Sequence, residues 1–110
     1  MSQTMQQIII TEPGGVDKLA YETVATPSPA NNEVLVKVHA FGLNRPDILQ
    51  RQGLYPMPKG VTLVPGLEVA GIVEAVGADV TEFKVGDKVC GLTNGGGYAE
   101  YCVVPESQTL

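Results

Sequence analysis

The sequence has little of what a metal site, a disulfide framework or a membrane segment requires. Its 110 residues include two cysteines, one histidine and no tryptophan. The cysteines and the histidine show neither the CxxC nor the HxxxH spacing that is typical of zinc sites. No stretch approaches the roughly 18 consecutive apolar residues that a membrane helix needs. The composition therefore predicts a soluble protein that holds no metal and contacts no membrane.

Positive charge is also scarce. Seven lysines and arginines stand against twelve aspartates and glutamates, which gives a formal net charge of -5 at pH 7. The basic residues are scattered, so they form no stripe that could follow a phosphate backbone, and this argues against a nucleic-acid partner. The first residues, Met1 to Gln7, lack both the positive charge and the apolar stretch of a secretory signal, which indicates a cytoplasmic protein.

Four reactive or charged side chains lie within apolar or alternating segments. Cys90 and Cys102 occupy segments of the kind that form buried strands, so we expect buried free thiols, with a disulfide between neighbouring strands as the alternative. The lone histidine, His39, falls on an alternating segment, where we expect a partly exposed structural residue. Glu68 enters an apolar strand, so its carboxylate should be paired or exposed.

The residues that are present indicate one globular domain built mostly from strands. Apolar residues make up 44% of the chain, and the length allows a single domain. In residues 33–41, Val34 and Val36 share one face while Lys37 lies on the other, which is the period of a strand. This pattern predicts a mainly β protein with short helices, folded as a partly open β-barrel. The other predicted strands cover residues 7–11, 19–23, 69–76, 88–92 and 98–104.

One helix is predicted, over residues 44–52. Asn44 is a preferred N-cap, and Pro46 can occupy the first turn without losing a needed hydrogen bond. Asp47 complements the positive end of the helix, and Gly53 is a natural stop at its C-terminus.

The segment from residue 42 to residue 71 resembles the quinone oxidoreductases, in the zinc-free branch of the medium-chain dehydrogenase/reductase superfamily. It reads GLNRPDILQRQGLYPMPKGVTLVPGLEVAG. Zinc-dependent alcohol dehydrogenases of that superfamily place cysteine where Asn44 stands and histidine where Leu67 stands, and neither residue here can replace such a ligand. They also commonly insert a lobe with four cysteines where residues 90–98 of this chain run directly into a three-glycine loop. The resemblance therefore implies chemistry without zinc.

The resemblance also implies a fold, a division of labour and a reaction. Residues 1–110 would form a GroES-like N-terminal domain on the substrate side, truncated before the Rossmann domain that binds most of the NADPH. The nicotinamide would pass a hydride to a quinone or another conjugated carbonyl, such as an enone. The resemblance also implies a homodimer of the full-length protein, formed through that second domain. The glycines at 95–97 precede a predicted strand and not a helix, so they supply no dinucleotide fingerprint. We accordingly expect the fragment alone to be inactive.

Three candidate site residues come from the resemblance, each with a structural alternative. The Asn44 amide could hold the nicotinamide carboxamide or a substrate carbonyl, or it could only cap the helix. Asp47 could orient Asn44, Arg51 or a bound ribose, or it could only complement the helix dipole. Tyr55 is assigned a catalytic and substrate-binding role, because its phenol can donate to a carbonyl that is being reduced; the alternative is simple packing in its loop.

Leu67 is the fourth candidate, as a substrate-binding residue that lines an apolar pocket suited to a flat ring. Arg45 and Arg51 could meet a cofactor phosphate, but solvated surface positions are the preferred interpretation. Two other functions stay open for the chain: a reductase of enoyl thioesters or enones with the same metal-free cleft, and a stand-alone binding module without catalysis.

Overall fold

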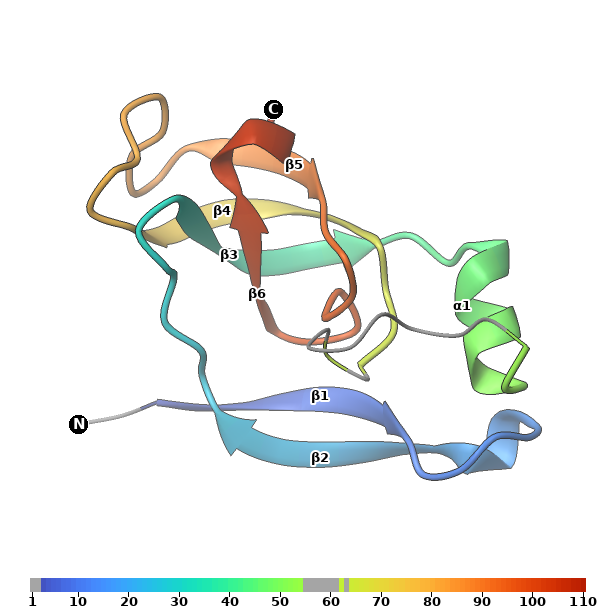
Figure 1. The fold of residues 1–110 in the computed structure, drawn as a ribbon. Helices are drawn as coiled ribbons and strands as arrows, with labels where there is room; N and C mark the ends of the chain where they lie inside the picture. The colour runs from blue at the N-terminus through green and yellow to red at the C-terminus, as the bar shows by residue number, and fades with distance from the viewer. Residues whose placement is uncertain (1–2, 55–61, 63) are drawn as a thin grey trace.

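The computed structural model describes residues 3–54, 62 and 64–110, and these form two antiparallel sheets, one α-helix and two short 3₁₀-helices (Figure 1). The smaller sheet pairs two strands, and the larger one has the order β5-β4-β3-β6. The strands are β1 (Thr4–Ile10), β2 (Leu19–Ala25), β3 (Glu33–Phe41), β4 (Glu68–Val76), β5 (Lys88–Leu92) and β6 (Tyr101–Pro105). The helices are η1 (Val16–Lys18), α1 (Arg45–Arg51) and η2 (Glu106–Gln108).

The core lies on the four-stranded sheet and is made mainly of valine. Val34, Val36, Val73 and Val104 are almost completely buried. Burying each of these branched side chains stabilises the fold by roughly 1.5–3 kcal/mol, and their stiff rotamers suit a pleated surface. The predicted alternation in β3 holds at Val34 and Val36, but Leu35 on the opposite face is buried as well.

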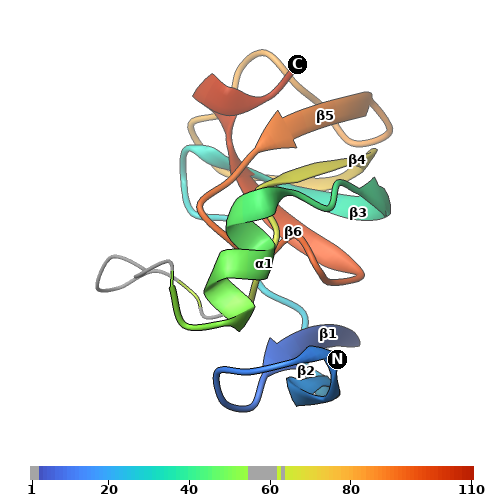
Figure 2. The same ribbon diagram turned by 90° about the vertical axis from the view of Figure 1, so that its right-hand side faces the viewer.

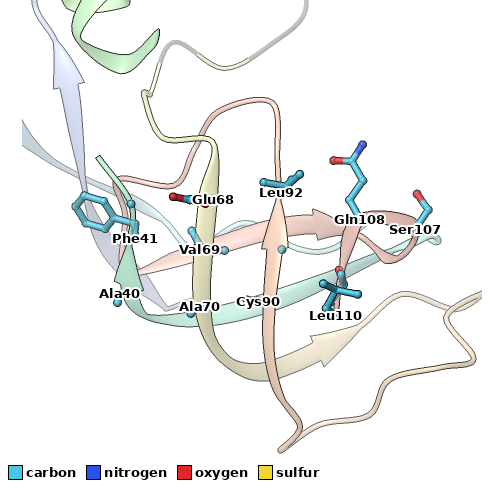
Figure 3. A pocket seen from close by; sticks show the side chains of 13 residues that line it. Ala40, Phe41, Glu68, Val69, Ala70, Cys90, Leu92, Ser107, Gln108 and Leu110 are labelled. Atoms are coloured by element: carbon cyan, nitrogen blue, oxygen red, sulfur yellow. The ribbon is translucent and has the colours of Figure 1, made fainter. Parts of the chain in front are cut away.

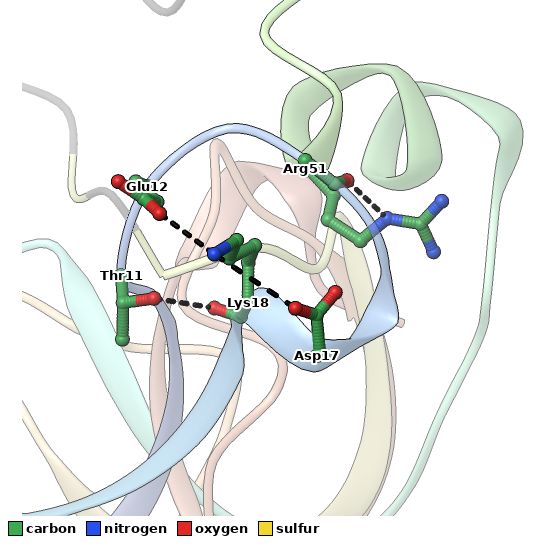
Figure 4. Close-up of polar contacts among 6 residues, drawn as sticks. Thr11, Glu12, Asp17, Lys18 and Arg51 are labelled. Atoms are coloured by element: carbon green, nitrogen blue, oxygen red, sulfur yellow. Dashed lines mark hydrogen bonds and ion pairs between the residues drawn. The ribbon is translucent and has the colours of Figure 1, made fainter.

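The β1–β2 ribbon lies beside the larger sheet, below it in both views, and α1 lies at the end of that sheet (Figures 1 and 2). The N–H of Ile8 donates to the carbonyl of Tyr98 at 2.8 Å, which attaches the ribbon to the loop before β6. Two hydrogen bonds hold the turn of the ribbon against α1. Arg51 Nε donates to the Gly14 carbonyl at 3.1 Å (Figure 4). The Gly14 N–H donates to the Arg51 carbonyl at 2.8 Å. An ion pair of 2.7 Å between Lys18 and Glu12 holds the same turn.

The predicted fold class is confirmed. The described residues form mostly strands with one short α-helix, and neither of their sheets closes into a barrel. The strand predicted to begin at Tyr98 begins at Tyr101 instead, because Gly95 and Gly96 adopt φ values of 124° and 89° and turn the chain before the strand can start.

The prediction that both cysteines are buried is wrong for Cys90. Cys102 is a buried free thiol, whereas Cys90 is a free thiol that is exposed. The reason is the position of β5, which forms an edge of the larger sheet and shows one face to solvent. His39 is exposed and stands near the end of β3.

The only α-helix in the described part of the chain has seven residues. No helix there is long and apolar enough to cross a membrane.

Candidate functional site

The site begins at the N-terminus of α1. Asn44 has an extended backbone, with φ −123° and ψ 158°, and is the N-cap that the sequence predicts. The carboxylate of Asp47 folds back and accepts a hydrogen bond from the backbone N–H of Asn44 at 3.1 Å, as in a capping box. At the other end, Gly53 adopts a φ of 81° and ends the helix. Both predicted ends of α1 are therefore confirmed.

Asp47 is a buried carboxylate, only 3% exposed. Its Oδ2 accepts a second hydrogen bond, from the hydroxyl of Tyr98 at 2.8 Å. No donor in the described part of the chain reaches its other oxygen, Oδ1. A buried charge needs such donors, because unpaired burial is costly. The two donors therefore decide how this carboxylate is oriented.

Tyr98 is held so that its hydroxyl remains a donor. Burial raises its pKa above the ordinary value, and the hydrogen bond to Asp47 and the negative charge of Asp47 raise it further. Its ring lies 4.5 Å from that of Phe41, centroid to centroid, at an interplanar angle of 30°. At neutral pH the phenol thus stays protonated and points at the Asp47 carboxylate.

The side chain of Asn44 is directed toward β4. Its Nδ2 donates to Oε1 of Glu68 at 3.1 Å. Glu68 lies against Gly42, where an added Cβ would overlap the Glu68 carboxylate and push that flexible side chain aside. A primary amide has two N–H groups, and the second one of Asn44 has no partner among the described residues. The expectation that Glu68 is paired or exposed is confirmed, since it is both.

Glu68 stands at the wall of a groove with a volume of about 680 Å³. Phe41 lies at one end of the groove and Gln108 at the other, with Glu68 and Leu92 between them (Figure 3). The lining is mostly carbon, and the Glu68 carboxylate is its one acidic group. A mostly apolar groove with few polar groups is the usual form of a small-molecule site. It is lined by residues 40–42, 68–70, 90–92 and 107–110.

The structure brings two of the four predicted site residues into contact, Asn44 and Asp47. Leu67 is half-buried, and its carbonyl accepts from the N–H of Thr93 at 2.9 Å, but its side chain does not line the groove. Its assigned role stays a prediction. Tyr55 lies outside the described residues. Arg51 donates to the Gly14 carbonyl, as described above, and Arg45 is exposed.

Sequence reasoning missed Glu68 and Tyr98 as members of this site. A carboxylate placed directly before an apolar strand was the available signal for Glu68. Nothing local distinguishes Tyr98, because its partner Asp47 is 51 residues away in the chain. Within residues 3–54, 62 and 64–110, no group of three histidine, cysteine, aspartate or glutamate side chains is placed to hold a metal ion.

Two curated proteins illustrate what the chain resembles in sequence. Quinone oxidoreductase from Sus scrofa is 44% identical over 104 residues, which are 93% of this chain and 32% of that protein. The synaptic vesicle membrane protein VAT-1 homolog from Danio rerio is 39% identical over 108 residues, which are 97% of this chain and 22% of that protein. The chain therefore spans about a third or less of the length of these relatives.

Solved structures show the same likeness in three dimensions. The human synaptic vesicle membrane protein VAT-1 homolog-like protein superposes with a TM-score of 0.91 at 35% identity, over 98% of this chain and 35% of that one. Quinone oxidoreductase from Escherichia coli, complexed with NADPH, gives 0.87 at 31% identity, over 96% and 32%. The CurK enoyl reductase gives 0.84 at 31% identity, over 98% and 35%.

The resemblance to quinone oxidoreductases that residues 42–71 indicate is thus confirmed by relatives and structures alike. A domain family, described as the alcohol dehydrogenase GroES-like domain, matches residues 30–110. This match includes α1, the four-stranded sheet and the groove beside Glu68. The chain belongs to the alcohol dehydrogenase GroES-like domain family.

Proposed function

We propose that this chain is the substrate-side domain of an NADPH-dependent reductase that acts on quinones without zinc. The observation that carries the proposal is the Asn44 amide, which Glu68 and the Asp47 cap hold beside an apolar groove, and whose second N–H has no partner among the residues that the structure describes. Zinc-dependent relatives place a thiolate at position 44 and an imidazole at position 67. An amide and an aliphatic side chain there favour a site that binds by hydrogen bonds and apolar contact.

This chain covers 32% of the quinone oxidoreductase from Sus scrofa, a length that leaves room for a second domain in that relative. A nucleotide-binding Rossmann domain would complete the cleft and bind most of the NADPH, and residues 1–110 would form the GroES-like unit beside it. NADPH, when bound, supplies a hydride from its nicotinamide ring. The complete protein would work in the cytoplasm as a homodimer.

The residues of this chain bind and orient the reactants. The second amide N–H of Asn44, the one that does not bond to Glu68, would donate to the nicotinamide carboxamide or to the acceptor carbonyl. The apolar wall near Phe41 and Leu92 would hold a flat ring and exclude water. Tyr55 would donate its phenolic proton to the oxygen that becomes negative, and Leu67 would add apolar contact near it.

A second function is favoured by the likeness to an enoyl reductase. In that case the acceptor is the conjugated C=C–C=O group of an enoyl thioester or a small enone. The residues of this chain would have the same tasks, because both acceptors place a developing negative oxygen near the hydride donor.

Steady-state assays on the complete protein distinguish the two functions. We expect NADPH oxidation with 1,4-benzoquinone and little or none with crotonyl thioester, at matched concentrations. Asn44→Ser tests the role of the amide, because serine is also a good N-cap but lacks the amide N–H. It should lower kcat/KM by about tenfold or more while the far-UV circular dichroism spectrum is retained. Turnover of the thioester alone would replace the first function by the second.

The isolated 110-residue chain gives a further check. We expect it to oxidise no NADPH with either acceptor, since most contacts to the dinucleotide would come from the proposed Rossmann domain. Activity from this chain alone would contradict the division of labour. The absence of NADPH binding and turnover in the complete protein would instead favour a non-catalytic binding module.

A further inference from the structure

A chain of hydrogen bonds connects Tyr98 to the groove. The Tyr98 hydroxyl donates to Asp47 Oδ2 at 2.8 Å, and the same oxygen accepts from the backbone N–H of Asn44 at 3.1 Å. The Asn44 amide then donates to Glu68 at 3.1 Å. These residues come from the loop before β6, from the start of α1 and from the start of β4. The sequence separates Tyr98 and Glu68 widely from the start of α1, and the fold brings these three segments into one continuous network.

We propose that Tyr98 is a positioning residue, which acts through Asp47 to fix Asn44 and so directs the Asn44 amide at the ligand in the groove. The proposal rests on the proposed function for the identity of that ligand, the nicotinamide of NADPH or the acceptor carbonyl. Tyr98 itself does not line this groove, and its hydroxyl donates to Asp47.

The main chain around Tyr98 is fixed closely enough for this role. Its N–H donates to the Pro65 carbonyl at 3.0 Å, and its own carbonyl accepts from Ile8 at 2.8 Å. A Cβ at Gly66 would lie 2.7 Å from the Tyr98 ring, so the backbone packs directly on that ring. On another side the ring contacts Phe41. With the backbone and the ring both held, the hydroxyl has a defined position toward Asp47.

Asp47 can transmit that position because it has few other constraints. The carboxylate is 3% exposed, and both of its hydrogen bonds within the described part of the chain end on one oxygen. Without the Tyr98 hydroxyl, the backbone N–H of Asn44 would be the one donor to the Asp47 carboxylate that remains among the described residues. A buried carboxylate that loses a donor reorients toward whatever donor or water it can reach. The backbone of Asn44, which donates to this carboxylate, would then be held less firmly. The Asn44 amide would therefore no longer point in one direction toward Glu68.

The test uses the complete protein and the variant Tyr98→Phe, which keeps the ring and removes only the hydroxyl. Tyr21→Phe is the matched control, because Tyr21 is 76% exposed on β2. With NADPH and 1,4-benzoquinone, we expect Tyr98→Phe to lower kcat/KM about tenfold, as for one lost hydrogen bond to a charged group. In an Asn44→Ala background the same change should have an effect within about twofold. An equal loss in both backgrounds would overturn the proposal.

A second readout does not depend on turnover. In protein labelled with ¹⁵N-asparagine, the side-chain amide signal of Asn44 is the one that disappears in Asn44→Ala. We expect Tyr98→Phe to shift or broaden that signal and Tyr21→Phe to leave it unchanged. An unchanged Asn44 signal in folded Tyr98→Phe refutes the positioning role, whatever the turnover. A shifted signal in a protein that reduces no quinone supports the positioning role and refutes the proposed function.

A variant at Asp47, the hydrogen-bond partner of Tyr98, keeps the test possible if Tyr98→Phe does not fold. If Tyr98→Phe does not fold, Asp47→Asn takes its place in the same experiment, because an amide of the same shape replaces the carboxylate. Its weaker bonds to Tyr98 and Asn44 should shift the Asn44 signal in the same way. An unchanged signal in this variant would count equally against the proposal.

Discussion

Replacement of Asp47 by alanine should destabilise the domain more than any surface substitution. The variant removes two hydrogen bonds to a charged acceptor, from Asn44 and from Tyr98, each worth about 1.5–3 kcal/mol. It also leaves the Tyr98 hydroxyl buried without an acceptor. Against this, the wild type buries a carboxylate whose Oδ1 has no donor among the described residues, and the variant removes that penalty. We expect a net loss of about 2–4 kcal/mol in the free energy of unfolding.

Urea denaturation followed by far-UV circular dichroism measures this loss. The midpoint should fall while the m-value is unchanged, because the same surface is exposed on unfolding. Asp17→Ala is the control, since Asp17 is an exposed acid in the first turn of η1 and has only a long ion pair of 3.8 Å. A loss below about 1 kcal/mol for Asp47→Ala would show that the network contributes little.

The stability of the domain at alkaline pH tests the same network, because Tyr98 ionises there. Its pKa is raised in the folded state, so its contribution to stability is complete below the unfolded value of about 10 and is lost as pH rises through the folded value. Tyr98→Phe lacks this group and should lose less stability above about pH 10 than the wild type. Parallel stability curves for the two proteins at high pH would contradict the assignment of that loss to Tyr98.

Three further predictions concern other positions. Iodoacetamide at pH 8 should alkylate Cys90, which is exposed, and spare Cys102, because burial raises the pKa of its thiol to about 11; peptide mass spectrometry would report both. Gly66→Ala should cost about 3 kcal/mol or prevent folding, because φ is 109° and a Cβ would lie 2.7 Å from the Gly97 backbone; thermal unfolding measures this. Gly42→Ala should displace the flexible Glu68 carboxylate, with less than about 1 kcal/mol of stability lost but weaker NADPH binding by the complete protein in a fluorescence titration.

Much of the fold follows from chemistry that is local in sequence. The start of α1 could be predicted because Asn44 and Pro46 favour an N-cap and a first turn, and its end because glycine at position 53 accepts a positive φ. The strand from residue 33 to residue 41 was predicted with its observed bounds, since valines recur at every second position from Val34 to Val38. In these segments the local preference and the tertiary structure agree.

The errors arose where the outcome depends on which elements become neighbours. The segment that contains Cys90 is indeed a strand, but its sequence does not tell that the strand lies at an edge of the sheet. Tyr98 has an apolar ring in an apolar segment, and only the turn at the preceding glycines takes it out of the strand. Its bond to Asp47 could not be predicted, because the contact exists only after two distant segments have packed.

The two interpretations of Asn44, helix cap and ligand donor, describe one arrangement. Asn44 has the extended backbone that a cap requires, and the hydrogen bond from its backbone N–H to Asp47 holds that backbone in place. The side chain is then free to meet Glu68 at the groove. Tyr98 donates to the same Asp47 oxygen that accepts from the backbone N–H of Asn44. A change at Tyr98 should therefore affect both the stability of the start of α1 and the orientation of the amide. Stability and ligand orientation are therefore coupled at this residue, and substitutions that keep the cap but change the amide are the ones that separate them.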